Sequence, residues 1–434
     1  MSIVDSFLPW LQVFYLPMTE PTGRALVALV TGWLFLPGRS LADRIRAAAG
    51  KLHCASYYRV LATARWSVDD VSGRLLAMFL HRWPQQTLIL VGDDTLLPRK
   101  GRKVFSAGMH RDPCLSTRQS TVKRWGHCWV VLSVVLRSSR DSTHYFCLPL
   151  MMRLYINEAT AKSQRRKCRA KTDLMLEMLQ LIEQRLPQQK LHFIADYGYT
   201  APAMLGRIPR RIEVTGRVHR RAKLYDPAPP RSAGRGRPRV RGARLASPEQ
   251  MLQQRTTRKL LKIAPGRSYR VRAASLQGCF YQVPDRRVKV VALEHLGRRR
   301  ENEAFYTTVL TASCQQIVQW YSQRWSIETT FRDCKQHLAI GAARNRTRGA
   351  VQRTAPTGFL LYSLIVLWHE TRPSTAAEVR KYRGKRHSSF ADMLAALRHD
   401  TLAQQRKRHL SASPLPPEWE KTLTYIEHLL ALAA

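Results

Sequence analysis

The segment that most limits the possible folds is an apolar run, QTLILVGDDT at residues 86–95, which ends in two acidic residues and a threonine. Such a run is typical of a strand buried on both faces of a sheet. Two similar runs follow at residues 127–136 and 143–152, and residues 171–186 then have apolar positions at helical spacing. A further run, LHFIADYGY at 191–199, again carries an acidic residue near its end. This order of strands, helix and strand predicts an α/β fold.

At 434 residues the chain is too long for one compact core, so we expect several structural units. Residues 1–85 have helical periodicity and are expected to form a helical domain. Within it, SLADRIRAAAG at 40–50 and SYYRVLATARW at 56–66 flank a Gly50-Lys51 turn. This pattern fits a DNA-binding helix-turn-helix, and it fits an ordinary helical hairpin packed on the main domain equally well. The apolar stretch from Ala25 to Pro37 is shorter than the roughly 20 residues of a membrane span, so we expect a buried helix and no membrane partner.

The remainder of the chain divides by composition. Residues 86–205 are expected to form the first part of the α/β core, and residues 301–350 its second part, with a long helix that begins near Ser313. Residues 206–300 hold 26 Lys and Arg against five acidic residues, which predicts a basic, β-rich insertion with a flexible Arg-rich loop. Residues 351–434 are expected to be a C-terminal helical region.

The net charge is +42, from 72 Lys and Arg and 30 Asp and Glu, which makes a polyanion such as DNA the expected partner. Because 44% of the residues are apolar, the chain can still bury a core, and the positive charge must lie on its surfaces. The eight cysteines include no CxxC pair and no zinc-finger spacing, which argues against a structural zinc site or a disulfide framework. With no secretion signal either, we expect a cytoplasmic protein associated with the nucleoid.

Three carboxylates stand out because of the elements that carry them. Asp94 and Asp196 each end a buried strand, and Glu328 lies on the long helix. Each one alone is better explained as an acidic residue at the solvent edge of the sheet. Together they could hold two divalent cations about 3.5–4 Å apart, the arrangement that activates a nucleophile and stabilises the leaving oxygen in phosphodiester transfer. Hard cations such as Mg²⁺ prefer oxygen ligands of this kind.

The helix that carries Glu328 has the most informative pattern. At about 100° per residue, four polar side chains fall within about 60° of one another: Tyr321, Arg324, Glu328 and Lys335. An apolar strip lies beside them: Trp320, Ile327, Phe331 and Leu338. One strip is expected to pack on the core, while the other presents a carboxylate between two cations and a phenol, as a metal ligand with phosphate-binding neighbours would be.

These four polar residues reproduce the Y-x2-R-x3-E-x6-K motif of the DDE transposases of the insertion-sequence 4 superfamily. VGDDT around Asp94 resembles the first acidic motif of that family, and IADYGYT around Asp196 resembles the second. The order of strand, strand, basic insertion and helix is also similar, so the resemblance covers roughly residues 86–350. The DDT motif and the basic loop are most similar to the insertion sequence 701-like branch.

The resemblance implies a ribonuclease H-like core in which Asp94, Asp196 and Glu328 are the catalytic residues and bind two Mg²⁺ or Mn²⁺ ions. In the family motif the ligand directly precedes the threonine, which selects Asp94 and leaves Asp93 beside it as a supporting residue. It also implies that Tyr321, Arg324 and Lys335 contact the DNA backbone near the cleaved phosphate.

Two basic clusters are further candidates for DNA binding. One directly follows Asp94 and contains Arg99, Lys100, Arg102 and Lys103. The other, GRGRPR at 234–239, resembles an AT-hook and contains Arg235, Arg237 and Arg239, although a solvated basic linker would look the same. Some relatives stack an insertion tryptophan on a flipped base, but residues 206–300 contain none. The aromatic residues that could replace it are Tyr225, Tyr269, Phe280 and Tyr281.

The resulting hypothesis is a transposase that binds the inverted-repeat ends of an insertion sequence as double-stranded DNA. It would hydrolyse a phosphodiester and join the freed 3′-hydroxyl to target DNA, acting as a homodimer because two ends must be cut together. Two alternatives remain open: a nuclease or resolvase that cuts without joining, and a non-catalytic DNA-binding relative.

Overall fold

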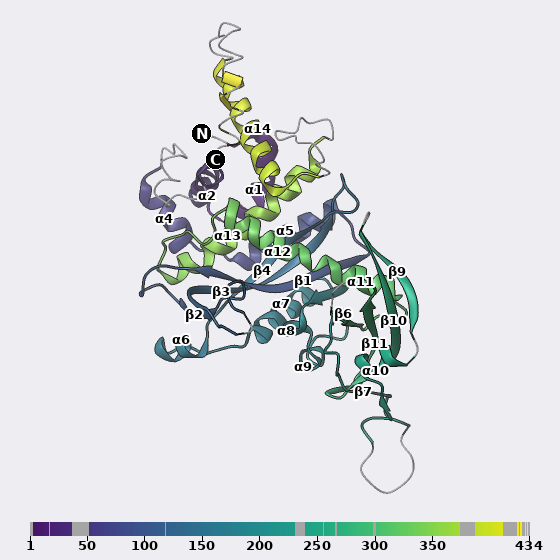
Figure 1. The fold of residues 1–434 in the computed structure, drawn as a ribbon. Helices are drawn as coiled ribbons and strands as arrows, with labels where there is room; N and C mark the ends of the chain where they lie inside the picture. Colours follow the sequence, from purple (N-terminus) through teal and green to yellow (C-terminus); the bar gives the residue numbers. More distant parts are fainter. Residues whose placement is uncertain are drawn as a thin grey trace.

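The computed structural model describes residues 3–16, 18–36, 52–117, 119–230, 239–254, 256–264, 267–297, 301–373 and 387–410, with scattered positions between 423 and 432. A twelve-stranded mixed sheet runs through the molecule, with helices on both faces (Figure 1). The expected helix at 40–50 and most of the expected C-terminal helical region beyond residue 410 lie outside the described residues.

The central part of the sheet has the strand order β4-β3-β1-β5-β6. Its strands are β1 (Thr87–Pro98), β3 (Lys123–Arg137), β4 (Tyr145–Tyr155), β5 (Lys190–Ala195) and β6 (Ile212–Arg217). β1 is antiparallel to β3 and parallel to β5, and β5 is parallel to β6. This mixed order with flanking helices confirms the predicted α/β, ribonuclease H-like fold class.

Helices cover both faces of this core, which explains why its strands are apolar along most of their length. Figure 1 places α7 (Lys171–Arg185) and α8 (Tyr197–Thr200) below the sheet, and α12 (Trp325–His337) and α13 (Arg348–Thr371) above it. α13 lies in the region expected to be helical and is buried from Ala355 to Glu370. The remaining helices of this half are α6 (Glu158–Ser163), α9 (Pro202–Leu205), α11 (Cys314–Gln323) and α14 (Phe390–Leu410).

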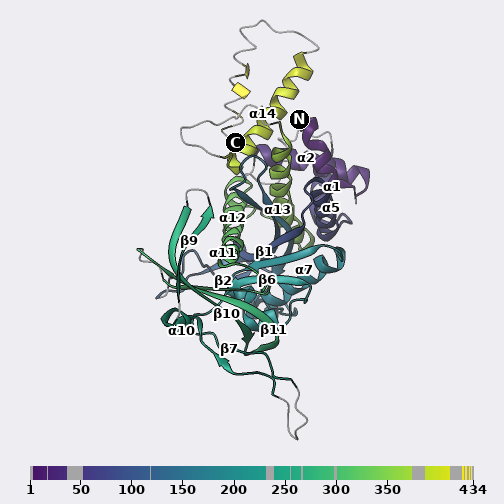
Figure 2. The ribbon, with the colours of Figure 1, turned by 90° about the vertical axis from the view of Figure 1, so that its right-hand side faces the viewer.

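The basic insertion continues the same sheet. Beyond β6 the strand order is β12-β11-β10-β7-β8, and β9 pairs with β10. The long β10–β11 hairpin dominates this half of the molecule (Figure 2). Because β6 pairs with β5, the core sheet extends to Arg217, past residue 205, where the composition changes. The elements of this half are β7 (Leu224–Tyr225), β8 (Arg244–Leu245), α10 (Pro248–Gln253), β9 (Thr257–Ala264), β10 (Arg267–Phe280), β11 (Val283–His295) and β12 (Glu303–Thr307); the short β2 (Gly108–Arg111) pairs with β3 at the other end.

The N-terminal helices pack on the core and share its hydrophobic cluster. They are the 3-10 helix η1 (Asp5–Phe7), α1 (Leu8–Tyr15), α2 (Glu20–Phe35), α4 (Cys54–Ala62) and α5 (Val68–Arg82). α2 confirms the buried helix expected from Ala25, and none of the described helices is long and apolar enough to cross a membrane. α4 packs on α2 and α13. Since residues 40–50 are outside the described residues, the helix-turn-helix stays a prediction.

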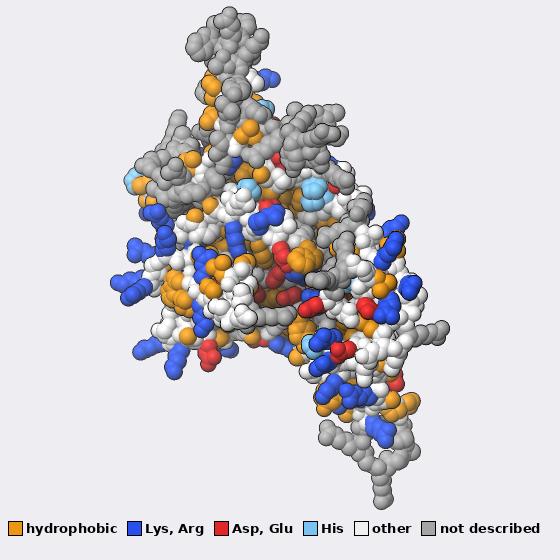
Figure 3. Space-filling model, in the orientation of Figure 1, with side chains coloured by type: hydrophobic (Ala, Val, Ile, Leu, Met, Phe, Trp, Pro, Cys, Tyr) orange, Lys and Arg blue, Asp and Glu red, His pale blue; other side chains and the backbone are white. Residues whose placement is uncertain are grey.

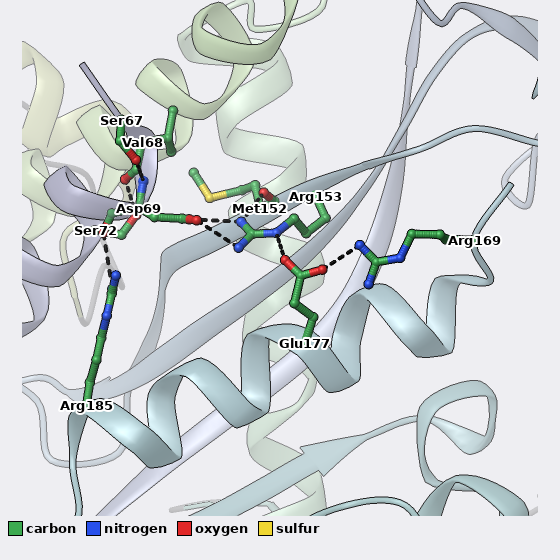
Figure 4. A network of polar contacts seen from close by, with 9 residues as sticks. All are labelled: Ser67, Val68, Asp69, Ser72, Met152, Arg153, Arg169, Glu177 and Arg185. Atoms are coloured by element: carbon green, nitrogen blue, oxygen red, sulfur yellow. Dashed lines mark hydrogen bonds and ion pairs between the residues drawn. The ribbon is translucent and has the colours of Figure 1, made fainter. Parts of the chain in front are cut away.

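Arg153 of β4 joins the N-terminal helices to the core (Figure 4). Its guanidinium donates to both oxygens of Asp69 on α5 at 2.9 Å and to Glu177 on α7 at 2.7 Å. Arg169 also pairs with Glu177, at 2.5 Å. One side chain thus holds two helices against the same strand.

We expect Arg153→Met to lower the free energy of unfolding by about 2 kcal/mol, because it leaves the half-buried Asp69 without its cation and Glu177 with only the more exposed Arg169. Arg169→Met is the matched control: it removes a more exposed cation from the same Glu177 and should cost less than about 0.5 kcal/mol. Urea unfolding of both variants measures the difference. Equal losses would mean that Arg153 does not join the two parts.

Candidate active site

The parallel pairing of β1 with β5 brings two acidic residues together. The paired positions end at Gly92 and Ala195, so Asp93 and Asp196 are the next residues along the two strands. Asp196 leaves the sheet and caps α8, and its carboxylate accepts a hydrogen bond from the backbone N–H of Gly198 at 2.9 Å. Asp93, in the middle of β1, therefore lies beside Asp196, which follows the carboxyl end of β5. The carboxyl ends of parallel strands are where α/β proteins place their active sites.

The third carboxylate comes from the helical pair α11 and α12. Ser313 caps α11 through a capping box with Gln316, which confirms the helix start expected near Ser313. The helix is interrupted at Arg324, so the expected single helix is two consecutive helices. Ile327, Phe331 and Leu338 are buried as predicted. Their burial leaves Glu328, one turn after Arg324, on the exposed side of α12.

Arg324 connects the helix to the strand. Its Nη2 donates to Glu328 Oε1 at 2.7 Å, and its Nη1 donates to Asp93 Oδ2 at 3.3 Å. The guanidinium is 8% exposed, and its Nε has no hydrogen-bond partner among the described residues. Burial would lower the pKa of Arg324, but Tyr321, Glu328 and Asp93 raise it above its usual value. The guanidinium is therefore a permanent cation between two carboxylates.

Asp93 is electrostatically unusual. Burial raises its pKa to about 7, and the neighbouring charge of Asp196 acts in the same direction. A hydrogen bond from the backbone N–H of Asp94 and the charge of Arg324 only partly offset this effect. Asp93 is thus a carboxylate whose negative charge is poorly compensated, which is the environment that a bound cation would relieve.

Asp94 points to the opposite face of the sheet, since successive side chains of a strand alternate. Its carboxylate accepts from Lys171 Nζ on α7 at 2.6 Å and from the hydroxyl of Tyr199 on α8 at 2.7 Å. The buried thiol of Cys128 lies 3.3 Å away. Asp93, Arg324 and Glu328 therefore share one face of the sheet, and Asp94, the residue predicted to bind metal, lies on the other face.

Asp93, Asp196 and Glu328 are suitable ligands for a divalent cation, although the described structure does not gather them around one point. Among the described residues, no three Asp, Glu, His or Cys side chains lie close enough to hold one ion together. The guanidinium of Arg324 lies between Asp93 and Glu328, where it partly compensates the charge of each. The donors themselves are carboxylate oxygens, the ligand type that Mg²⁺ and Mn²⁺ prefer.

Tyr321 and Lys335 are the other two residues of the helical motif. Tyr321 is buried against Phe305 at a ring distance of 4.7 Å, and the charge of Asp196 acts on its pKa, which burial raises. Lys335 lies two turns beyond Glu328 and is exposed. Figure 3 shows acidic side chains in a hollow where Figure 1 places α11 and α12, with Lys and Arg side chains around it.

Trp325 was missed by the sequence analysis. Its side chain is 57% exposed, directly between Arg324 and the turn that carries Glu328. The guanidinium carbon of Arg324 lies 4.9 Å from the ring centroid. Its position in the helix could have revealed it. In the helical projection Trp325 falls outside the apolar strip that contains Trp320 and Ile327, and so large an apolar side chain is unusual outside such a strip.

The basic and aromatic residues that the sequence suggests for DNA binding lie in different parts of the structure. Arg99 is buried, whereas Lys100, Arg102 and Lys103 are exposed on the segment after β1. Arg239 is exposed, while Arg235 and Arg237 lie outside the described residues. Of the four aromatic residues, Tyr269 and Phe280 are buried and Tyr225 is half-buried. Tyr281 is exposed, with the guanidinium of Arg241 3.7 Å from its ring centroid, so it is the insertion aromatic best placed to stack on a base.

Comparison with known proteins adds one finding. Residues 13–279, more than half of the chain, match the family described as DDE superfamily endonuclease. The matched range contains Asp93, Asp94 and Asp196 and ends before the helix that carries Glu328. No curated protein matches the chain.

Proposed function

Because the chain belongs to the DDE superfamily endonucleases, whose members are nucleases that generally use divalent metal ions, we propose that it is a DNA transposase. The observation that carries the proposal is the juxtaposition of Asp93 and Glu328 through Arg324, next to Asp196. The intact Tyr321, Arg324, Glu328 and Lys335 spacing supports the insertion-sequence 4 superfamily, with the insertion sequence 701-like branch as the finer proposal.

Asp93, Asp196 and Glu328 are proposed to hold two Mg²⁺ or Mn²⁺ ions, which when bound activate the attacking oxygen and stabilise the leaving one. Asp93 replaces Asp94 in this role because only Asp93 faces Glu328. Arg324 then turns from the carboxylates to the scissile phosphate, and Tyr321 and Lys335 position the same strand. Hydrolysis and joining differ only in the nucleophile, so the same carboxylates would serve both reactions.

Asp94 receives a positioning role in this proposal. Tyr199, which donates to Asp94, belongs to the helix that Asp196 caps, so this bond joins the segments that carry Asp93 and Asp196. Lys171 adds a contact from α7. Asp94 would keep β1 and the end of β5 in register without binding metal.

The decisive experiment is a strand-transfer assay on duplex DNA that carries the inverted repeats expected beside the coding region. Wild-type protein should nick this DNA with Mg²⁺ or Mn²⁺ and join pre-cut ends to target DNA. Cutting without joining would establish the nuclease or resolvase instead. Binding without cutting, with no calorimetric signal for divalent metal in the presence of DNA, would establish the non-catalytic relative. Because two ends are joined together, a dimer is expected on DNA, and light scattering of the complex measures it.

Trp325 provides a separate test of where the DNA lies. An exposed indole beside the carboxylates can stack on a base, and such stacking contributes about 1–3 kcal/mol. We therefore expect Trp325→Ala to lower cleavage efficiency by roughly 5- to 100-fold, with an unchanged melting temperature because the ring is largely exposed. Trp325→Phe should retain most of the activity. If alanine and phenylalanine behave as wild type, the strand does not pass over this ring.

A further inference from the structure

A second site lies at the far end of the elements that carry Asp93 and Glu328. It is a pocket of about 990 Å³ between the segment after β1, the start of β3 and the segment 341–346 after α12. Five basic residues line it, and no acidic residue does: Arg99, Lys100, Arg124, Arg344 and Arg346. The indole of Trp125 donates to the carbonyl of Gly101 at 3.1 Å, which holds one wall of the pocket in place.

Most of this positive charge is uncompensated. Arg124 is paired with Asp112 at 3.4 Å. Lys100, Arg344 and Arg346 are exposed, and no carboxylate of the described residues pairs with them. A cluster of like charges without counter-ions is unfavourable unless an anion joins it.

Arg99 contributes a buried charge to the same pocket. It is 7% exposed, its Nε donates to His127 Nδ1 at 3.0 Å, and its Nη1 donates to the carbonyl of Ala343. Its Nη2 has no partner among the described residues. Burial lowers the pKa of Arg99 to about 10, so the group is still charged at neutral pH. Neutral acceptors fix its position without cancelling its charge, so the pocket keeps a positive potential.

The distance between the acidic hollow and the pocket corresponds to several base pairs of DNA. Arg99 lies six residues beyond Asp93 along β1 and the segment that follows, which is about 20 Å of extended chain. On the other wall, α12 leads from Glu328 past the exposed Lys335 to the segment 341–346. Measured along the axis of a duplex, successive phosphates of one strand are about 3.4 Å apart. A duplex that is cut beside Glu328 and extends towards the pocket would therefore pass the pocket about five or six base pairs from the cut.

We propose that this pocket binds the phosphate backbone of duplex DNA about five or six base pairs from the phosphodiester that is cleaved. The inference rests on the proposed function, since it takes the acidic hollow as the cleavage site. It assigns the pocket to the transposon end or its flank, as a second anchor that sets the direction in which the DNA leaves the carboxylates.

The test compares Arg344→Ser/Arg346→Ser with a matched control, Arg74→Ser/Arg82→Ser, in which two exposed arginines are removed from α5. Binding is measured by fluorescence anisotropy without divalent metal, so it does not depend on cleavage. Three duplexes are used: one that extends ten base pairs on both sides of the cleavage position, and two that end after two base pairs on one side or the other. All four substitutions are at exposed positions, and melting temperatures check that the fold is retained.

On the full duplex, the pocket variant should bind about tenfold more weakly than the control, and the slope of affinity against salt should fall by roughly two. Truncation on one side should remove this difference, and truncation on the other side should not. A loss equal to that of the control, or a loss that neither truncation changes, would overturn the proposal. Failure of the proposed function shows separately, as absence of cleavage by the wild-type protein.

Discussion

Asp93→Asn will abolish metal-dependent cleavage of the inverted-repeat DNA, whereas Asp94→Asn will keep at least about a tenth of it. Removing a metal ligand forfeits several kcal/mol of transition-state stabilisation, so we expect a loss of at least about 10³-fold for Asp93→Asn. Asp196→Asn and Glu328→Gln should match it. In Asp94→Asn the hydroxyl of Tyr199 can still donate to the amide oxygen, and only the partly exposed ion pair with Lys171 is lost. That loss is worth about 1 kcal/mol, or a tenfold fall in rate at most.

The two neighbouring aspartates control for each other, because they share a strand and differ only in the face to which they point. DNA binding without metal should survive in both variants, and so should the melting temperature of Asp93→Asn. Burial already favours the uncharged form of Asp93, which asparagine resembles. An inactive Asp94→Asn with an active Asp93→Asn would return the ligand role to Asp94 and reject the assignment made from the structure.

Asp93 and Asp94 also show which part of the site could not be predicted from the sequence. The apolar runs predicted the central strands and α7, and the helical spacing predicted the burial of Ile327, Phe331 and Leu338, because burial on both faces of a sheet or along one face of a helix leaves a periodic pattern. Nothing in VGDDT reveals which aspartate faces α12, because that depends on a helix more than 200 residues later. The interruption at Arg324 was likewise hidden, since the residue keeps nearly helical angles.

The insertion illustrates a different limit. Its composition changes at residue 206, yet β6 continues the core sheet to Arg217. Charge and proline content report what is exposed, whereas strand pairing depends on which edge of the sheet is free. The basic pocket also escaped the sequence analysis. Arg99 and Lys100 were visible as a cluster, but Arg344 and Arg346 join them only after α12 has folded back onto the sheet.

Arg324→Gln will destabilise the metal-free protein and make its stability strongly dependent on Mg²⁺ or Mn²⁺. The substitution leaves Asp93 and Glu328 without their cation, and Asp93 still feels the charge of Asp196. Breaking a buried pair costs about 3–5 kcal/mol, and the partial exposure of Glu328 reduces the expected cost to roughly 2–3 kcal/mol. A divalent cation binds only the folded arrangement of carboxylates, so it should restore the melting temperature in proportion to its concentration.

The wild-type protein should respond less to metal, because the ions must first displace a guanidinium that already neutralises the same carboxylates. Arg324→Lys is the informative control: it keeps the charge but cannot bridge two carboxylates as a fork, so its metal response should be intermediate. Cleavage should fall by about 10²-fold or more in Arg324→Gln even with saturating metal, since the phosphate loses its charged partner. Thermal unfolding of the three proteins over a metal titration measures the first effect, and nicking assays measure the second. Identical metal responses in all three would show that Arg324 does not occupy the place of the cation.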